Sequence, residues 1–209
     1  MPIIRDAISS GTANPGTSLT ISHVNAGNLL VVGVGAASST DIITGVTYNS
    51  VAMIRTANGY QAMGGGINRS AYMYYLLTPS IGTANIVISA GSSLAIESNN
   101  GSYRGVLQNG QPDATVSNSA AASTTVANTL TTIADNCIHM AFYYVDGAAP
   151  TSVTNGTLLG DFMAESNPLV ITPVGAHTMT GSAAPSQNWA TCGASFSPIT
   201  GGYLGGKYL

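Results

Sequence analysis

The chain has 209 residues, of which only five are Lys or Arg and eight are Asp or Glu, so its formal net charge is −3. Charged residues make up 6% of the chain, against roughly a quarter in an ordinary soluble domain, so hydroxyls, amides and backbone groups must supply most of its polar surface. The basic residues are scattered, which argues against partners that need a positive patch, namely nucleic acid and an anionic membrane. A hydrophobic content of 44% is too high for a disordered chain.

Strand patterns dominate the sequence from end to end. Short runs rich in Val, Ile, Thr and Tyr alternate with Gly, Asn, Ser and Pro about every ten residues, and helical periodicity with caps is missing. This spacing predicts an all-β fold, an antiparallel β-sandwich of jelly-roll or immunoglobulin-like type. In chain order the predicted strands are 3–9, 18–24, 29–37, 45–49, 51–56, 70–77, 85–90, 96–103, 123–130, 137–145, 158–163, 176–180 and 189–196.

Two of these runs, 70–77 and 137–145, have apolar residues on both faces, which predicts the central strands of the fold. In 70–77 the alternation places Tyr72 and Tyr74 on the face opposite Met73. Because one sandwich core buries only one face of a strand, we expect Tyr72 and Tyr74 to contact another subunit. The chain is therefore expected to form a homo-oligomer, and specifically a trimer.

The domain organisation predicted from the sequence is a single β-sandwich over 1–197 followed by a Gly-rich arm over 198–209. The polar stretch 108–122 is interpreted as a long connection within one sandwich. The alternative, a boundary between two small domains, is disfavoured because neither half shows its own closing set of strands. We expect the arm to be flexible and to order only by docking four apolar side chains on a neighbouring subunit or particle surface: Tyr203, Leu204, Tyr208 and Leu209.

Residues suited to catalysis are few and separated. The eight acids do not form a sequence pair, which argues against a glycosidase, and no GxSxG motif or His and Cys cluster occurs. Asp113 or Asp146 with backbone carbonyls could bind calcium in a loop, although turn carboxylates exposed to solvent are the plainer interpretation. His139, within an apolar strand, is expected to be a hydrogen-bonded core or interface residue. The sequence thus predicts a protein that is not an enzyme and needs no cofactor.

The cysteines and aromatic residues allow two further predictions. Cys137 and Cys192 are far apart in a chain without a Sec-type signal, which favours buried thiols over a disulfide and production in the cytosol. Trp189, Tyr60 and Tyr103, with neighbouring amides, could form a sugar-binding platform. A lone Trp in an alternating strand is more often a core residue.

Four stretches of the sequence resemble a β-sandwich module found in tailed-phage virion proteins and in some bacterial surface proteins, with a likeness that covers about 19–196. They are 27–34 (GNLLVVGV), 45–53 (GVTYNSVAM), 74–83 (YYLLTPSIGT) and 102–106 (SYRGV). The module often has Asn-Gly in its hairpin, where this chain has Asn49 and Ser50.

The resemblance implies a structural protein located in the virion, a head decoration or cement protein or a fibre component, and it carries over no catalytic residues. Its partners would be copies of itself and other virion proteins such as the major capsid protein. The alternative from the residues is a carbohydrate-binding or adhesin module at a fibre tip, with a surface glycan as its ligand. The low charge and the abundant small polar residues agree with a subunit whose surface is partly covered in an assembly.

Overall fold

The computed structural model describes residues 1–147 and 149–199, and this part of the chain is all-β and antiparallel, as predicted. Among these residues, no helix is long and apolar enough to cross a membrane. The elements are β1 (Ile4–Asn25), β2 (Leu29–Ala36), β3 (Ile43–Tyr48), β4 (Val51–Ala52), β5 (Ile54–Ala62), the 3-10 turn η1 (Gly64–Gly66), β6 (Ser70–Leu77), β7 (Gly82–Arg104), β8 (Ala114–Thr131), β9 (Ile138–Val145), β10 (Val153–Thr154), β11 (Gly156–Leu158), β12 (Met163–Ser166) and β13 (Ala176–Phe196).

The strands form two sheets, and each sheet closes on itself into a barrel-like shape. The first has the order β4-β3-β7-β2-β6-β5 with β1 paired along β7. Its two outermost strands, β4 and β5, are joined through Met53, whose backbone N–H donates to Val46 O at 2.8 Å. The second sheet has the order β10-β13-β9-β12-β11 with β8 paired along β13, and only Asn155 separates β10 from β11. We call these sheets the first and second barrels.

The two barrels share one topology. In the first barrel, the long strand β1 pairs along the long strand β7, and the two halves of β7 also pair with β2 and β3. In the second barrel, β8 pairs along β13 in the same way, and the two halves of β13 also pair with β9 and β10. A Thr-Pro step, at Thr78 and Thr172, precedes β7 and β13, and a positive-φ glycine lies where each strand starts, Gly82 as the first residue of β7 and Gly175 directly before β13. The expectation that neither half has its own closing set of strands is therefore wrong.

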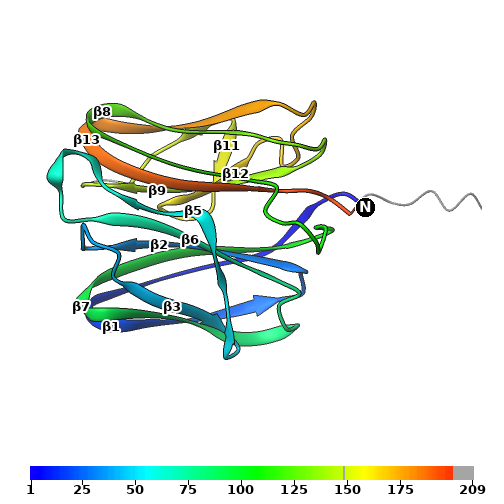
Figure 1. Ribbon diagram of the computed structural model, residues 1–209, viewed down its shortest axis with the longest axis horizontal. Helices are drawn as coiled ribbons and strands as arrows, with labels where there is room; N and C mark the ends of the chain where they lie inside the picture. The colour runs from blue at the N-terminus through cyan, green and yellow to red at the C-terminus, as the bar shows by residue number, and fades with distance from the viewer. Residues whose placement is uncertain (148, 200–209) are drawn as a thin grey trace, which may run out of the picture.

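The four long strands bend back on themselves, which produces four layers (Figure 1). Each strand leaves the end of the molecule near the N-terminus, turns at the far end and returns. As a result, predicted pairs of strands merge: 3–9 with 18–24 in β1, 85–90 with 96–103 in β7, and 176–180 with 189–196 in β13. Register shifts around Gly16 and between Ser182 and Gln187 allow the bends in β1 and β13.

Two predictions concern stretches between strands, the connection at 108–122 and the turn at 49–50. The stretch 108–122, interpreted as a connection, is mostly the first half of β8, which bends at Ala122 with φ of 48°. Asn49 and Ser50 form the two-residue turn between β3 and β4, with φ of 47° and 65°. A turn with two positive φ values usually contains Gly, so Ser50 is held there by the pairing of β3 with β4.

Among the residues that the structure describes, the buried apolar side chains form three clusters. One fills the first barrel, one fills the second, and the largest lies between them, where β2 and β6 face β9 and β13. Gly33 and Gly35 of β2 permit this contact, because a Cβ at either position would collide with the ring of Phe142 or Tyr144 of β9. The two barrels therefore pack sheet against sheet in a sandwich-like arrangement.

Candidate functional site

Tyr72 and Tyr74, expected on a partner-facing surface, lie inside the first barrel. Tyr72 is fully buried and Tyr74 is 4% exposed, among apolar side chains of β1, β2, β3 and β7. The chain itself covers the second face of β6, because the sheet closes around it. The argument that these two tyrosines must contact a partner is therefore wrong. The other expected partner-binding residues lie outside the described residues: Tyr203, Leu204, Tyr208 and Leu209.

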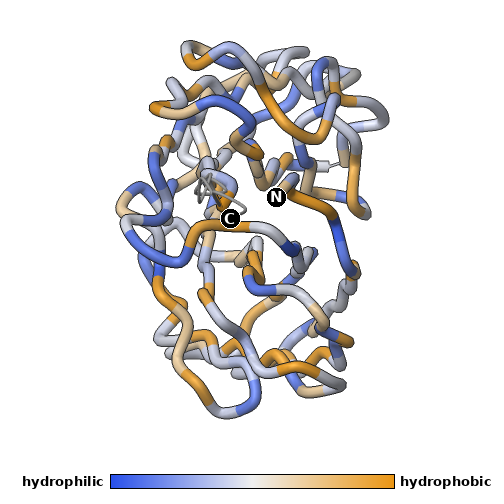
Figure 2. The backbone as a smooth tube through the Cα atoms, turned by 90° about the vertical axis from the view of Figure 1, so that its right-hand side faces the viewer, coloured by the Kyte–Doolittle hydropathy of each residue, from blue (hydrophilic) through white to orange (hydrophobic). Residues whose placement is uncertain are grey.

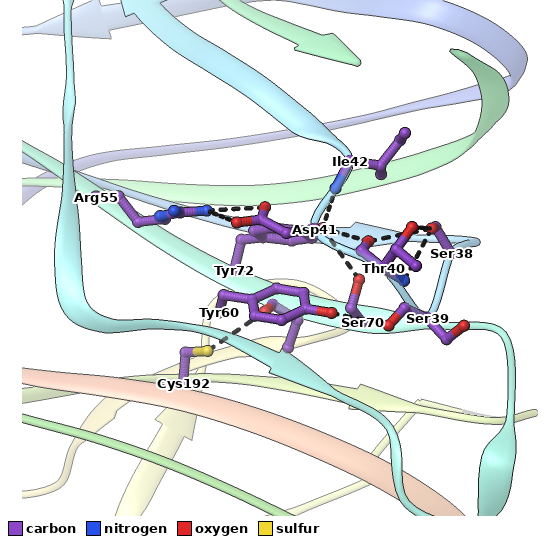
Figure 3. Close-up of polar contacts among 11 residues, drawn as sticks. Ser38, Ser39, Thr40, Asp41, Ile42, Arg55, Tyr60, Ser70, Tyr72 and Cys192 are labelled. Carbon is purple, nitrogen blue, oxygen red and sulfur yellow. Dashed lines mark hydrogen bonds and ion pairs between the residues drawn. The ribbon is translucent and has the colours of Figure 1, made fainter. Parts of the chain in front are cut away.

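At the rim of the first barrel, tyrosine hydroxyls hold the loop between β2 and β3 (Figure 3). The Tyr72 hydroxyl accepts from the Ile42 backbone N–H at 3.0 Å and donates to Thr40 O at 3.3 Å. Tyr60 donates to Ser39 O at 2.8 Å. These bonds give the loop one conformation and place its acidic residue over β5.

That acidic residue, Asp41, forms an ion pair with Arg55 (Figure 3). Both residues line an open groove. Arg55 Nη1 donates to both carboxylate oxygens, at 2.8 and 2.7 Å. Both side chains are about two-fifths exposed, 39% and 41%, so the pair adds ~1 kcal/mol or less to stability. Burial raises the pKa of Tyr74 on the groove wall to about 12. The groove has a volume of about 450 Å³ and is lined by Asp41, Ile43, Thr44, Gly45, Val46, Thr47, Ala52, Met53, Arg55 and Tyr74.

The sugar platform considered for Trp189, Tyr60 and Tyr103 is not assembled. Trp189 is 4% exposed inside the second barrel, and Tyr103 is fully buried between the barrels. Tyr60 lies at the rim of the first barrel, packed against its core. Two of the three rings thus belong to separate cores and cannot present a common face to a ligand.

A small recess between the barrels collects polar groups that the sequence showed only as scattered residues. It has a volume of about 210 Å³ and is lined by Ser10, Gly11, Thr12, Glu97, Ser98, Asn99, Asp161 and Phe162. Pairing of β1 with β7 places Thr12 opposite Glu97, and the β11–β12 loop brings Asp161. Sequence reasoning missed this site because strand register carries no signature in the sequence.

Glu97 is the chemically unusual group in this recess. Its Oε2 atom is buried and has no hydrogen-bond partner among the described residues. Burial raises the pKa of Glu97; the positive charge of Arg69 opposes this shift and the negative charge of Asp161 adds to it. A carboxyl with a raised pKa beside hydroxyls, an amide and an aromatic ring could hydrogen-bond a small polyhydroxy ligand.

Both cysteines are buried free thiols, which confirms that part of the sequence interpretation. Cys137 donates to Asp113 at 3.1 Å, and Asp113 also accepts from Ser195 and Ser197. Burial, reinforced by Asp113, raises the pKa of Cys137 to about 11, although Ser197 opposes the shift. The thiol therefore stays protonated near neutral pH and acts as a hydrogen-bond donor rather than a nucleophile.

The two calcium candidates belong to separate networks. Asp113 is engaged by the Cys137 and serine donors, whereas Asp146 forms an ion pair with Arg69 at 3.4 Å. Within residues 1–147 and 149–199, no group of three or more His, Cys, Asp and Glu side chains could hold a metal ion.

His139 is a hydrogen-bonded core residue, as predicted. It is fully buried, with Nε2 at 2.7 Å from Asn128 Oδ1 and Nδ1 at 3.0 Å from Nδ1 of His177. Asn128 uses its NH₂ group to donate to Thr191 at 2.9 Å, so its Oδ1 is the acceptor and His139 Nε2 carries the hydrogen. Burial lowers the pKa of both histidines, and each is neutral at pH 7.

The described chain begins and ends at one end of the molecule, the end that faces the viewer in Figure 2. We call the exposed aliphatic residues of the chain termini and of the strand ends nearest to them the end face. This end face consists of Met1 (71% exposed), Val24 (58%), Ile81 (71%), Ile133 (70%), Val174 (49%) and Ile199 (37%). Ile81 and Val174 occupy equivalent positions in the two barrels, directly before Gly82 and Gly175. Within it lies the terminal groove, of about 490 Å³, lined by Met1, Pro2, Ala134, Asp135, Asn136, Val170, Pro198 and Ile199.

No protein-family model matches the chain, and comparisons with curated proteins and with solved structures found no similar protein. The resemblance of four sequence stretches to a phage virion module therefore stays a prediction. A proposed function has to depend on the geometry of the groove, the recess and the end face.

Proposed function

We propose that the chain is a structural subunit of a tailed-phage particle, a head decoration or cement protein, and that it works through surface contacts rather than catalysis. Its partners in this proposal are copies of itself and the capsid shell. The exposed aliphatic side chains of the end face are the observation that carries it. The jelly-roll or immunoglobulin-like type expected from the sequence is part of the same proposal.

The end face supports an assembly role because exposed aliphatic groups gain free energy when a partner covers them. Full burial of one such side chain contributes ~1.5–3 kcal/mol. Scattered apolar residues are ordinary on a monomer, but six near one end, contributed by both barrels and the chain termini, favour a contact surface. Interface cores are also depleted of charge, and only 6% of this chain is charged.

The use of the ionisable residues supports a role without catalysis. Asp6 accepts hydrogen bonds from Arg104 and from the Ala26 backbone, and Asp41 holds Arg55. Most charged groups of the described residues are thus engaged in stabilising loops and strand ends. A rigid body with few free reactive groups suits a protein that reinforces a shell.

Particle composition tests this proposal. Particles purified from the phage that carries the gene should contain the chain in a fixed ratio to the major capsid protein, measured by quantitative mass spectrometry. Ile133→Asp on the end face should reduce that ratio at least tenfold, whereas Ile8→Asp, at a position 52% exposed within β1 and away from the strand ends, should leave it unchanged. A chain found only in the soluble fraction contradicts the proposal.

Carbohydrate binding is a second candidate, favoured by the recess at Glu97. Its hydroxyl, amide, carboxyl and aromatic lining suits one sugar ring. Saturation-transfer NMR with methyl glycosides of glucose, galactose, mannose and N-acetylglucosamine should then show contact, lost in Asn99→Ala and kept in Asp41→Asn. The absence of contact with all four glycosides would exclude this candidate for these sugars.

A further inference from the structure

We propose that the terminal groove is a receptor for residues 200–209 of a neighbouring copy of this chain. The inference depends on the proposed function in one respect, that copies of the chain contact each other through the end face.

The groove has the size and chemistry of a binding site for apolar side chains. Its volume of about 490 Å³ lies within the range of ~300–1,000 Å³ typical of pockets that bind small ligands. Pro2, Val170, Pro198 and Ile199 supply an apolar wall, and Asp135 supplies an exposed carboxylate. Asp135 is anchored by the Val174 backbone N–H, which donates to its Oδ1 at 2.6 Å.

The sequence of 200–209, TGGYLGGKYL, complements that lining. Two Tyr-Leu pairs, each preceded by glycine or lysine, offer apolar groups of suitable size, and Lys207, the only lysine of the chain, can pair with Asp135. Ten extended residues reach up to about 33–36 Å, enough to cross from one copy to the next. We therefore infer that one Tyr-Leu pair fills the groove while Lys207 lies near the carboxylate.

The position of Ile199 favours a neighbouring copy as the source of the segment. The Ile199 backbone is held from both sides: its N–H donates to Gly105 O at 2.7 Å, and its carbonyl accepts from Met1 N at 2.9 Å. Because Ile199 itself forms part of the groove wall, a copy's own Tyr203 could enter only after a reversal within 200–202. The same segment of a neighbouring copy can enter the groove without such a reversal.

When each copy docks its 200–209 segment in the groove of the next copy, the result is a closed, symmetric oligomer. Each copy provides one segment and receives one, so a ring of any cyclic symmetry can satisfy all grooves. The apolar gain on docking is offset by the entropy of ordering a segment with four glycines. The exchange should therefore depend on protein concentration.

Sedimentation velocity of the full-length chain and two full-length variants tests the inference. The groove variant, Ala134→Gln, fills the cavity but keeps the 200–209 segment. The segment variant replaces Tyr203, Leu204, Tyr208 and Leu209 with Ser and keeps the groove. We expect the unmodified chain to be oligomeric at micromolar concentration and each variant alone to be monomeric. An equimolar mixture should associate again, through the one intact groove and the one intact segment.

The outcomes separate the inference from the proposed function. If both variants stay as oligomeric as the unmodified chain, the groove is not the receptor, although self-association stands. If the unmodified chain is monomeric at all concentrations, exchange between copies is excluded, and particle composition still decides the proposed function. Ile8→Asp, within β1 and away from the end face, should remain oligomeric, and circular dichroism must show the same β-sheet spectrum for all variants. A mixture that fails to associate overturns the inference.

Discussion

Tyr103 of β7 donates its hydroxyl hydrogen to Oε2 of Glu165 of β12 over 2.9 Å, and this bond joins the two barrels inside their shared core. Arg5 of β1 donates to the other carboxylate oxygen at 2.6 Å. Tyr103 is fully buried and Glu165 is 5% exposed, and burial raises the pKa of both groups. The Tyr103–Glu165 bond is therefore one of several polar contacts between the barrels, and it lies within the apolar cluster that they share.

Removing this contact should destabilise the chain. Tyr103→Phe leaves Glu165 Oε2 buried without its donor, which costs about 1–3 kcal/mol of unfolding free energy. Tyr60→Phe, which removes a bond at the solvent-exposed rim, should cost about 1 kcal/mol or less. Urea denaturation monitored by circular dichroism measures both values. Equal losses in the two variants would contradict a special role for the contact between the barrels.

The buried histidine pair should make stability depend on pH. Because burial lowers the pKa of His139 in the folded state, the unfolded chain binds the proton first, and stability falls as pH decreases below about 6.5. While His139 stays neutral, the loss approaches about 1.4 kcal/mol per pH unit. Raised pKa values at Glu97 and Glu165 act with the opposite sign, since there the folded state binds protons first.

The difference between the unmodified chain and His139→Gln isolates the histidine contribution. Unfolding free energies measured at pH 7, 6 and 5 should fall less steeply for the variant, because glutamine does not titrate. Parallel curves for the two proteins would show that His139 does not remain neutral in the folded state over this range.

Gly33 should be intolerant of a side chain, because the ring of Phe142 occupies the space over it. Gly33→Ala forces β2 away from β9, and overpacking of this kind costs about 1–3 kcal/mol. Gly45→Ala is the matched control, since nothing lies within 4 Å of a Cβ there. Thermal unfolding should show a clear decrease in Tm for the first variant only. An unchanged Tm for Gly33→Ala would mean that the barrels are not packed as closely as described.

The thiols should be unreactive in the folded protein. Cys192 is fully buried and Cys137 has a pKa raised to about 11, so Ellman's reagent at pH 8 should titrate neither until a denaturant is added. Under denaturing conditions two thiols per chain should react. Rapid reaction of one thiol in the folded protein, or fewer than two after denaturation without a reductant, would count against this arrangement.

The sequence by itself determined the fold class and part of the core. Alternation of polar and apolar residues is a local property, so the central strands at 70–77 and 137–145, the buried thiols and the hydrogen-bonded His139 could be predicted from it. The low charge likewise argued, before any geometry, against phosphate-binding and lipid-binding surfaces.

Only the tertiary structure decided which strands pair and where each sheet closes. The burial of Tyr72 and Tyr74 depends on β4 and β5 joining opposite ends of one sheet, and the recess at Glu97 depends on the register of β1 against β7. Alternation shows that a residue has two possible faces, but not which distant strand covers each one. That choice is made by hydrogen bonds between residues far apart in the chain, and a strand's own sequence does not specify its partner.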